Sequence, residues 1–436
     1  MTDMTNRPQH IVVEGLPAVG KSELLALIER FYSDQAVVLP EMVKEVVLRD
    51  GLDLFTDRSA LAAALLAELP RRRQAIEMAL AAGKLCLEES HMGVHLAYCR
   101  ALSDPSLDGH LDELERAAPM ADLYLRLEAA EAVSVFRQRA RGTPDFEVEE
   151  PTLRKMTQFL ASWHAGRPTR VVSVDADRSA HEVVAEVVDL LGLQYRGVAM
   201  PNDDVFPVVL LLGRPASGKS ELIDYMQRTP LAVRRSRYRL GTLRVVDDFP
   251  ILWRKFIEDD LWEKTGRRRL YSRAEVGNYS VTDDGIWSFL IERLNEEVEP
   301  LLAARRPGKT LVIEFSRGGK RGYADALERL STAVLDRAAI LYVDVPFEES
   351  WRRNLARYDV ARRDGILTHS VPRKEMERTY GDDDWHELAR EGAGRIRVAG
   401  REIPYVTMNN VPELTDPRGL DTRYREALER LRRAAS

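Results

Sequence analysis

Cysteine and long hydrophobic runs are scarce in this sequence. Its 436 residues include only Cys86 and Cys99, which are too few for a disulfide framework or a zinc site. Cys86 lies in an apolar run and is expected to be a small buried hydrophobe. No apolar run approaches the roughly 18 residues of a membrane span, and the N-terminus has no secretory hydrophobic region. The sequence therefore predicts a soluble, cytoplasmic protein that does not enter a membrane.

Net positive charge is missing as well. The 64 lysines and arginines are outnumbered by 70 aspartates and glutamates, which gives a formal net charge of −6. Overall basic charge is the usual mark of a nucleic-acid-binding protein, so nucleic acid is not an expected partner. A chain of this length is too long for one ordinary core, and two domains of about 200 residues match the usual domain size.

The most informative stretch present is Gly15-Leu16-Pro17-Ala18-Val19-Gly20-Lys21-Ser22. It has the pattern of a phosphate-binding loop, it follows the apolar residues 11–13, and apolar residues at helical spacing come after it. Glycines let backbone N–H groups turn toward one centre, and the next helix adds its positive N-terminal end. Lys21 can reach the β- and γ-phosphates, and the Ser22 hydroxyl can bind Mg²⁺. The expected ATP-binding residues are Gly15, Ala18, Val19, Gly20, Lys21 and Ser22.

The same pattern occurs a second time, as Gly213-Arg214-Pro215-Ala216-Ser217-Gly218-Lys219-Ser220 after the apolar residues 208–212. We expect ATP contacts from Gly213, Ala216, Ser217, Gly218, Lys219 and Ser220. Apolar strand-like runs alternate with helical patterns in both halves, which is typical of parallel sheets. The predicted fold class is α/β, with two P-loop NTPase domains, each a parallel sheet with helices on both faces. Breaker residues place a linker at 194–207, between domains at 1–193 and 208–436.

Carboxylates follow two further apolar runs of the first half. Glu41 comes just after residues 36–39, and Glu88 ends the run at residues 85–87. Residues just beyond a parallel strand face the ligand crevice, so Glu41 is a candidate general base for a substrate hydroxyl. A solvated loop carboxylate is the alternative interpretation of Glu41. Glu88 is the predicted ligand of Mg²⁺ through water, because phosphoryl transfer needs charge neutralisation.

Arginines gather in the next helical stretch of the first half. Arg137, Arg139 and Arg141 precede Gly142-Thr143-Pro144, which breaks the helical pattern. Cations on a closing segment neutralise a migrating phosphoryl group, so Arg137 and Arg141 are candidate catalytic residues of a lid. Surface charge is the alternative interpretation.

The second half repeats the order of these parts. Asp247 ends an apolar run where the first half has Pro40-Glu41, and it is the candidate catalytic carboxylate there. Glu314 ends the run that parallels residues 86–91, since a serine follows two positions after Glu314 as it does after Glu88. Glu314 and Ser220 are therefore the predicted Mg²⁺ residues, and Arg353 and Arg357 are the predicted lid cations.

Taken together, the first half resembles a deoxynucleoside kinase or thymidylate kinase of the P-loop kinase group. The resemblance rests on the loop, on Glu41, on Leu87-Glu88-Glu89-Ser90 and on Arg137 to Arg141-Gly142. It implies that Glu41 is the base. The family has Glu-Arg-Ser where this chain has Glu88-Glu89-Ser90, so the arginine is missing. The second half resembles P-loop nucleotide kinases or adenylylsulfate kinases in layout only.

These patterns favour an ATP-dependent kinase with two ATP sites. Its acceptor would be a nucleoside, a nucleotide or a similar small hydroxylated molecule, its cofactors ATP and Mg²⁺, and its assembly a possible homodimer. Lys21 and Lys219 would act on the transferred phosphoryl group in their respective halves. The alternative from another class is a nucleotide-binding regulatory protein, in which one or both loops sense or hydrolyse ATP. End-phosphorylation of a nucleic acid is a third hypothesis, which the acidic net charge disfavours.

Overall fold

The computed structural model describes residues 9–53, 56–101, 108–140, 148–178, 180–196, 204–275, 278–304, 306–357, 373–414 and 416–436. These residues form two compact units. The first unit holds the described residues up to Arg196 together with Arg228–Pro230, and the second holds the others. The limits 1–193 and 208–436 stay a prediction.

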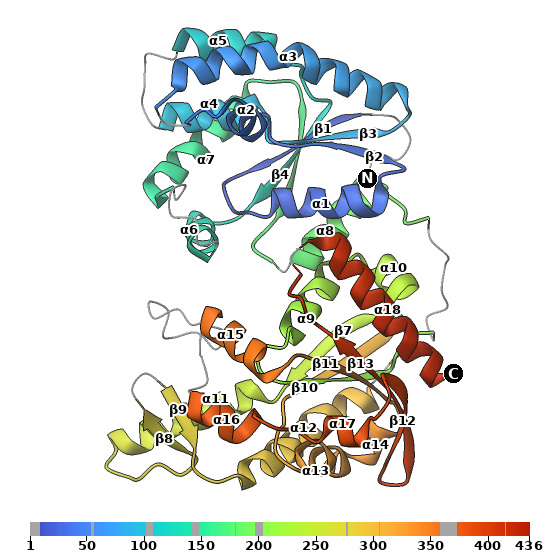
Figure 1. Cartoon of the computed structure of the whole chain (residues 1–436). Helices are drawn as coiled ribbons and strands as arrows, with labels where there is room; N and C mark the ends of the chain where they lie inside the picture. The colour runs from blue at the N-terminus through green and yellow to red at the C-terminus, as the bar shows by residue number, and fades with distance from the viewer. Residues whose placement is uncertain are drawn as a thin grey trace. The chain divides into compact units, whose positions relative to one another are not determined.

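The first unit is built on a five-stranded parallel sheet. Its strands stand in the order β2 (Ala36–Leu39), β3 (Leu85–Glu89), β1 (His10–Gly15), β4 (Leu123–Glu128) and β5 (Arg170–Asp175). On one face lie α1 (Lys21–Tyr32) and α8 (Ala180–Leu190), and on the other lie α3 (Arg58–Ala81) and α5 (Asp108–Ala117), as Figure 1 shows. The remaining helices are α2 (Met42–Asp50), α4 (Met92–Ala101), α6 (Glu131–Ala140) and α7 (Glu150–Ala165).

Burial of apolar side chains on both faces explains this layering. All six residues of β1 are buried, as expected for the central strand of a parallel sheet. Helix α1 buries Leu24, Leu25, Ile28 and Phe31 along one stripe, and each such side chain contributes roughly 1.5–3 kcal/mol. The loop between β1 and α1 is thereby held at the carboxyl edge of the sheet, where α/β proteins bind ligands.

The second unit repeats the strand order of the first. Its sheet runs β7 (Thr242–Asp247), β10 (Lys309–Phe315), β6 (Val208–Gly213), β11 (Ala338–Asp344), β13 (Arg401–Asn409) and β12 (Ala393–Val398). Helices α9 (Lys219–Arg228) and α18 (Pro417–Ala435) lie on one face, opposite α12 (Gly285–Ala303), α13 (Gly322–Arg329) and α14 (Thr332–Leu335) (Figure 1). The predicted α/β fold with helices on both faces is confirmed.

One edge of the second sheet departs from the prediction of a purely parallel sheet. Strand β12 pairs antiparallel with β13. The two strands are joined by Ala399 and Gly400, whose φ angles are 47° and 79°. A two-residue loop with both φ angles positive makes a tight hairpin, and a hairpin forces neighbouring strands to run antiparallel.

An aromatic segment is inserted between β7 and β10. It contains α11 (Phe249–Lys264) and the hairpin β8 (Ser272–Glu275) and β9 (Asn278–Val281). Leu252, Phe256 and Val281 form its apolar centre. The fully buried Asp259 joins α11 to the hairpin, because its carboxylate accepts hydrogen bonds from the backbone N–H groups of residues 270, 271 and 272 and from the Ser272 hydroxyl.

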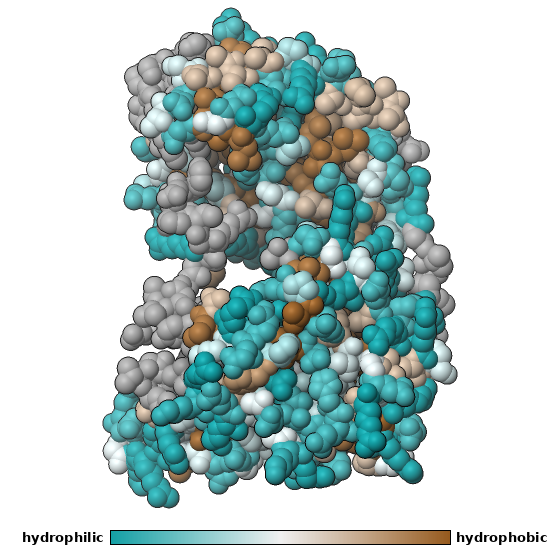
Figure 2. Space-filling view, in the orientation of Figure 1, coloured by the Kyte–Doolittle hydropathy of each residue, from teal (hydrophilic) through white to brown (hydrophobic). Residues whose placement is uncertain are grey.

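The other elements of the second unit, apart from α15 (Phe347–Arg357), are short. They are α10 (Leu231–Val233), the π-helix η3 (Arg234–Tyr238), α16 (Arg373–Tyr380) and α17 (Trp385–Leu388). Hydrophilic residues predominate on the face shown in Figure 2, with hydrophobic residues in small groups. None of the described helices has the length and apolar character needed to cross a membrane.

Candidate active sites at the two phosphate loops

The two glycine-rich loops have the same backbone conformation. Three positions in each loop have positive φ angles: 148°, 58° and 100° at Gly15, Ala18 and Gly20, and 145°, 56° and 103° at Gly213, Ala216 and Gly218. A left-handed conformation at a non-glycine residue costs roughly 1–2 kcal/mol, yet an alanine adopts it in both loops. Successive N–H groups turned in this way form an anion-binding nest at the N-terminus of a helix, here α1 or α9.

The first glycine of each loop has a neighbour that excludes a side chain. A Cβ atom at Gly15 would collide with the carbonyl oxygen of Leu127 in β4, and one at Gly213 would collide with that of Val343 in β11. Both collisions involve backbone atoms, which cannot move without displacing a central strand. Only glycine fits these two positions.

The two loop lysines make the same contacts. Lys21 Nζ donates to the carbonyl oxygens of Gly15 at 3.0 Å and Leu16 at 2.9 Å. Lys219 Nζ donates to those of Gly213 at 3.0 Å and Arg214 at 2.9 Å. Both side chains are buried, and each ammonium lies across the mouth of its own nest. This is the arrangement from which an ammonium can reach phosphate oxygens.

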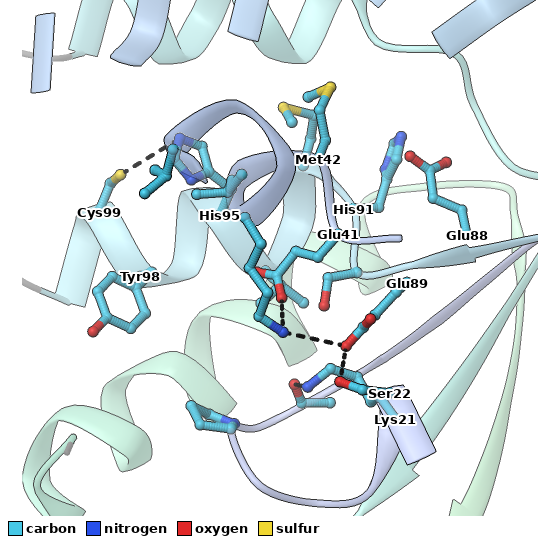
Figure 3. A pocket seen from close by; sticks show the side chains of 18 of the residues that line it. Lys21, Ser22, Glu41, Met42, Glu88, Glu89, His91, His95, Tyr98 and Cys99 are labelled. Atoms are coloured by element: carbon cyan, nitrogen blue, oxygen red, sulfur yellow. Dashed lines mark hydrogen bonds and ion pairs between the residues drawn. The ribbon is translucent and has the colours of Figure 1, made fainter. Parts of the chain in front are cut away.

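Ser22 contacts Glu89 and not the predicted Glu88. The Ser22 hydroxyl donates to Glu89 Oε1, and Figure 3 shows the Glu89 side chain directed toward Ser22 while Glu88 points the other way. Glu88 accepts from Arg72 Nε at 2.9 Å and lies 2.7 Å from His10 Nε2. Burial by itself would raise the pKa of Glu88, but the His10 hydrogen bond and the charges of His91, Arg72 and His10 lower it to about 2. The structure therefore corrects the Mg²⁺ candidate from Glu88 to Glu89.

Strand register explains why the sequence comparison selected a different glutamate from the one that contacts Ser22. Glu89 pairs with Val13 in β1, and Glu314 pairs with Leu211 in β6. Val13 and Leu211 each lie two residues before the first glycine of their loop, so Glu314 corresponds to Glu89. The serines that suggested a match with Glu88 are one residue out of register. Glu314 Oε1 lies 3.8 Å from Lys219 Nζ.

Glu41 and residues of the first loop line the same cavity. The cavity has a volume of about 450 Å³ and is lined by Lys21, Ser22, Glu41 and Glu89 together with mainly apolar side chains. Glu41 Oε2 lies 2.7 Å from Lys44 Nζ in α2, and Lys44 Nζ lies 3.4 Å from Glu89 Oε1. Burial opposes the charge on Lys44, but Glu41 and Glu89 raise its pKa above the ordinary value. The sequence analysis missed Lys44, although its i,i+3 spacing from Glu41 was a usable signal.

The first predicted lid arginine faces away from this cavity. Arg137 Nη1 donates to the carbonyl oxygen of Ala176, just after β5, at 3.0 Å, and Arg137 is not among the residues that line the cavity. In the same helix, the Ser134 hydroxyl donates to the Pro17 carbonyl of the loop at 2.7 Å. Arg137 therefore fastens α6 to the sheet edge in this structure, and its lid role stays a prediction. Arg141 lies outside the described residues.

The second unit contains the same two contacts. Ser350 donates to the Pro215 carbonyl at 2.6 Å, and Arg353 Nη2 donates to the Asn410 carbonyl at 2.8 Å. Arg353 is buried and also bonds Glu349 at 2.8 Å, so it too fastens its helix in this structure, and its lid role stays a prediction. The remaining lid candidate, Arg357, ends α15, and the description does not extend to its side chain.

Carboxylates converge at the second loop. Asp247 pairs with Glu314 across β7 and β10, and Asp248 therefore corresponds to Glu41. Burial, Glu314 and Asp248 together raise the pKa of Asp247 to about 7. A cavity of about 190 Å³ joins Lys219, Ser220, Asp247 and Glu314. Its other lining residues include charged side chains such as Asp248, Arg317 and Glu375 and six aromatic residues, Phe249, Phe256, Tyr279, Trp287, Phe315 and Tyr380.

The donors at each loop fit Mg²⁺ bound to ATP and do not fit a metal held by protein alone. Among the described residues, no group of three or more His, Cys, Asp or Glu side chains is arranged to hold a metal ion. Mg²⁺ prefers oxygen ligands and usually takes most of them from phosphates and water. Ser22 beside Glu89 would supply the protein's share in the first unit, and Ser220 and Glu314, which line one cavity, would supply it in the second.

Comparison with protein-family models gave no match, and neither did comparison with curated protein sequences. Two solved structures of deoxyadenosine kinase from M. mycoides are similar to part of the chain. One holds the product dCMP with a flexible dCDP, and the other holds dCTP. Both are 13% identical, with TM-scores of 0.34 and 0.33, and the alignments cover 42% of this chain and 98% of each kinase chain. The function proposed below rests on site geometry and not on this similarity.

Proposed function

We propose that this chain is an ATP-dependent kinase that phosphorylates a nucleoside, a nucleotide or a similar small hydroxylated molecule. One observation carries the proposal: in the first unit a single cavity of about 450 Å³ connects the phosphate loop to Glu41. A kinase needs an ATP phosphate site and an acceptor site that share one space, because the phosphoryl group passes directly between them. The mainly apolar lining suits the ring of a small organic acceptor.

The residues of the first site divide into two groups. The loop N–H groups, Lys21, Ser22 and Glu89 bind ATP with Mg²⁺, which neutralises charge on the phosphates. Glu41 accepts the proton of the acceptor hydroxyl as the hydroxyl oxygen bonds to the γ-phosphorus. The bond from that phosphorus to the oxygen bridging to the β-phosphate breaks, and ADP leaves. Catalysis of this kind is mostly positioning and electrostatic stabilisation.

The second unit carries the same functions on other residues. Lys219, Ser220 and Glu314 bind the second ATP with Mg²⁺, and Asp247 is the acceptor-side base. A general base works best when its pKa lies near the operating pH, and the pKa of Asp247 is raised to about 7. The smaller cavity of about 190 Å³, with its charged and aromatic lining, implies an acceptor different from that of the first unit.

Phosphoryl transfer from γ-labelled ATP to a panel of nucleosides, nucleotides and sugars tests the proposal. The parent chain is compared with Lys21→Ala, Lys219→Ala and the double variant, and Lys155→Ala is the matched control because Lys155 is exposed on α7. We expect each single variant to lose a different labelled product, and Lys155→Ala to keep both.

A distinct pattern supports the regulatory alternative. If ATP protects both loops from proteolysis but no acceptor is labelled, the chain binds nucleotide without transferring phosphate. The kinase function is then refuted. Loss of all labelling in Lys21→Ala alone would confine catalysis to the first unit and leave the second as a sensor.

A further inference from the structure

Few positive charges are available to the acceptor end of the first cavity. Among the described residues that line it, the lasting cations are Lys21, Arg72 and Lys44. Lys21 is bound to the loop carbonyls. Arg72 is occupied through all three guanidinium nitrogens, which bond Glu88, Glu45 and the carbonyl oxygen of Pro40. Of the described cations that line this cavity, Lys44 is the one whose ammonium contacts Glu41, with Nζ 2.7 Å from Oε2.

The two histidines of the lining do not change this conclusion. Burial lowers the pKa values of His91 and His95, that of His95 to about 4. Both rings are therefore neutral near pH 7. The arginine predicted for the task, Arg137, is bound to the Ala176 carbonyl instead.

Lys44 stands between the two functional ends of the site. Its Nζ lies 2.7 Å from Glu41 on the acceptor side and 3.4 Å from Glu89 on the ATP side. Glu89 in turn accepts the hydrogen bond of Ser22. Dashed lines in Figure 3 trace this chain of contacts from Glu41 to Ser22. The ammonium thus lies between the proposed acceptor base and the carboxylate that contacts Ser22.

We propose that Lys44 is a catalytic residue of the first site, whose ammonium contacts the phosphoryl group during its transfer. The proposal rests on the proposed kinase function. With ATP and Mg²⁺ bound, Glu89 would face the metal, and Lys44 would exchange that carboxylate for phosphoryl oxygens. Negative charge spreads over those oxygens in the transition state, and a nearby cation stabilises it. Glu41 would remain the group that accepts the proton of the acceptor hydroxyl.

The second unit gives independent support from different residues. Arg317 Nη1 lies 2.6 Å from Oδ2 of Asp248, the counterpart of Glu41. At the position of Lys44, three residues beyond that carboxylate, the second unit has Ile251. Arg317 follows the end of β10, whereas Lys44 belongs to α2. Both sites thus hold a cation beside the same carboxylate, although its residue type and its element differ.

The test uses the full chain with Lys219→Ala, so that transfer reports on the first site. Lys44→Ala and Lys44→Arg are compared with the matched control Lys155→Ala. The first readout is kcat and KM with γ-labelled ATP and the acceptor labelled in the panel. The second is the affinity for ADP with and without aluminium fluoride, which imitates the phosphoryl group in flight.

We expect Lys44→Ala to lower kcat about 10²–10³-fold, as removal of one transition-state donor does. KM for ATP and for the acceptor should stay within about threefold, because the contact forms only during transfer. Aluminium fluoride should tighten ADP binding in the parent and in Lys155→Ala but not in Lys44→Ala. Lys44→Arg should recover kcat to within about tenfold of the parent, since the positive charge is kept.

Three results overturn the proposal. In the first, kcat of Lys44→Ala stays within about threefold of the parent. In the second, Lys44→Ala raises only the KM for the acceptor, which would make Lys44 a binding residue. In the third, the parent transfers no phosphate to any acceptor, which refutes the kinase function and with it the role of Lys44. The first two results leave the kinase function standing, whereas the third refutes it. Failure of the Lys44 role and failure of the kinase function are therefore distinguishable.

Discussion

The two units share the conformation of the phosphate loop and the contacts that hold it. They differ in the residue that precedes the loop in its strand. The shared contacts come from Ser134 and Arg137 in one unit and from Ser350 and Arg353 in the other. Beneath the first loop lies Glu14, fully buried and hydrogen-bonded to His164. Its counterpart in β6 belongs to an entirely apolar run.

This difference shows which parts of the site phosphate binding requires. The backbone nest, the glycine that touches the neighbouring strand and the fastened helix recur because an anion needs fixed N–H donors. The buried Glu14–His164 pair of the first unit has no polar counterpart in β6, so phosphate binding does not require it. Buried ionic groups cost desolvation and add little net stability, but they hold neighbouring groups in one arrangement when every partner is present. In the first unit that arrangement includes Glu88, adjacent to Glu89.

The largest expected effect comes from substituting the first glycine of either phosphate loop. Gly15→Ala and Gly213→Ala each place a methyl group against a backbone carbonyl, so each should weaken ATP binding at its own loop at least about 100-fold. Titration calorimetry in a chain whose other loop lysine is alanine measures this loss. The control is Gly51→Ala, where φ is also positive, at 65°, but no atom lies within 4 Å of the new Cβ. Equal losses in Gly15→Ala and Gly51→Ala would contradict the steric account.

The next largest effect concerns the buried ion pair between Arg72 and Glu88 in the first unit. Arg72→Ala removes a cation from the buried Glu88, so it should destabilise the first unit by about 3–5 kcal/mol and leave the second unchanged. Denaturant-dependent hydrogen exchange resolves the two units, with peptides from β3 and β10 as reporters. Arg73→Ala is the neighbouring control and should cost less than about 1 kcal/mol, because Arg73 is exposed and bonds the Ala117 carbonyl. Similar costs for both variants would show that the buried pair does not matter.

Because the two fastening arginines are buried to different extents, we expect their alanine variants to lose different amounts of unfolding free energy. Arg353 is buried and bonds Asn410 and Glu349, whereas Arg137 is half-buried and bonds the Ala176 carbonyl. We expect Arg353→Ala to cost about 2–3 kcal/mol of unfolding free energy in its unit and Arg137→Ala about 1 kcal/mol. The same exchange experiment, read at β13 and β5, measures both. A kcat loss in Arg137→Ala without any loss of stability would support the lid role.

The smallest effect concerns pH and only the second unit. The pKa of Asp247 is raised to about 7 in the folded protein, against roughly 3.9 when unfolded. Folding then binds a proton between these values, so this group's contribution to stability is full below about pH 4 and is lost as pH rises to about 7. Asp247→Asn stays neutral and should be more stable than the parent at pH 8 but equal to it at pH 4. Urea denaturation at both pH values checks this, and a difference that is the same at both would exclude the titration.

Local patterns in the sequence were sufficient for the loops and for the fold class. A phosphate loop is a contiguous motif, and its flanking apolar periodicity fixes a strand and a helix around it. The choice between Glu88 and Glu89 was not local, because it depends on the register of β3 against β1 and on Arg72, a partner from α3. The fastening role of Arg137 likewise depends on where β5 ends. Contacts of this kind arise only when distant segments pack together.

The central claim is that the first cavity, lined by both Lys21 and Glu41, is a reaction chamber. The most direct test is single-turnover transfer from γ-labelled ATP to the labelled acceptor in Glu41→Gln, which keeps the shape of the side chain but cannot take the proton. The account predicts a transfer rate about 10²–10⁴-fold below that of the parent, with unchanged ATP affinity. An unchanged transfer rate in Glu41→Gln would contradict it.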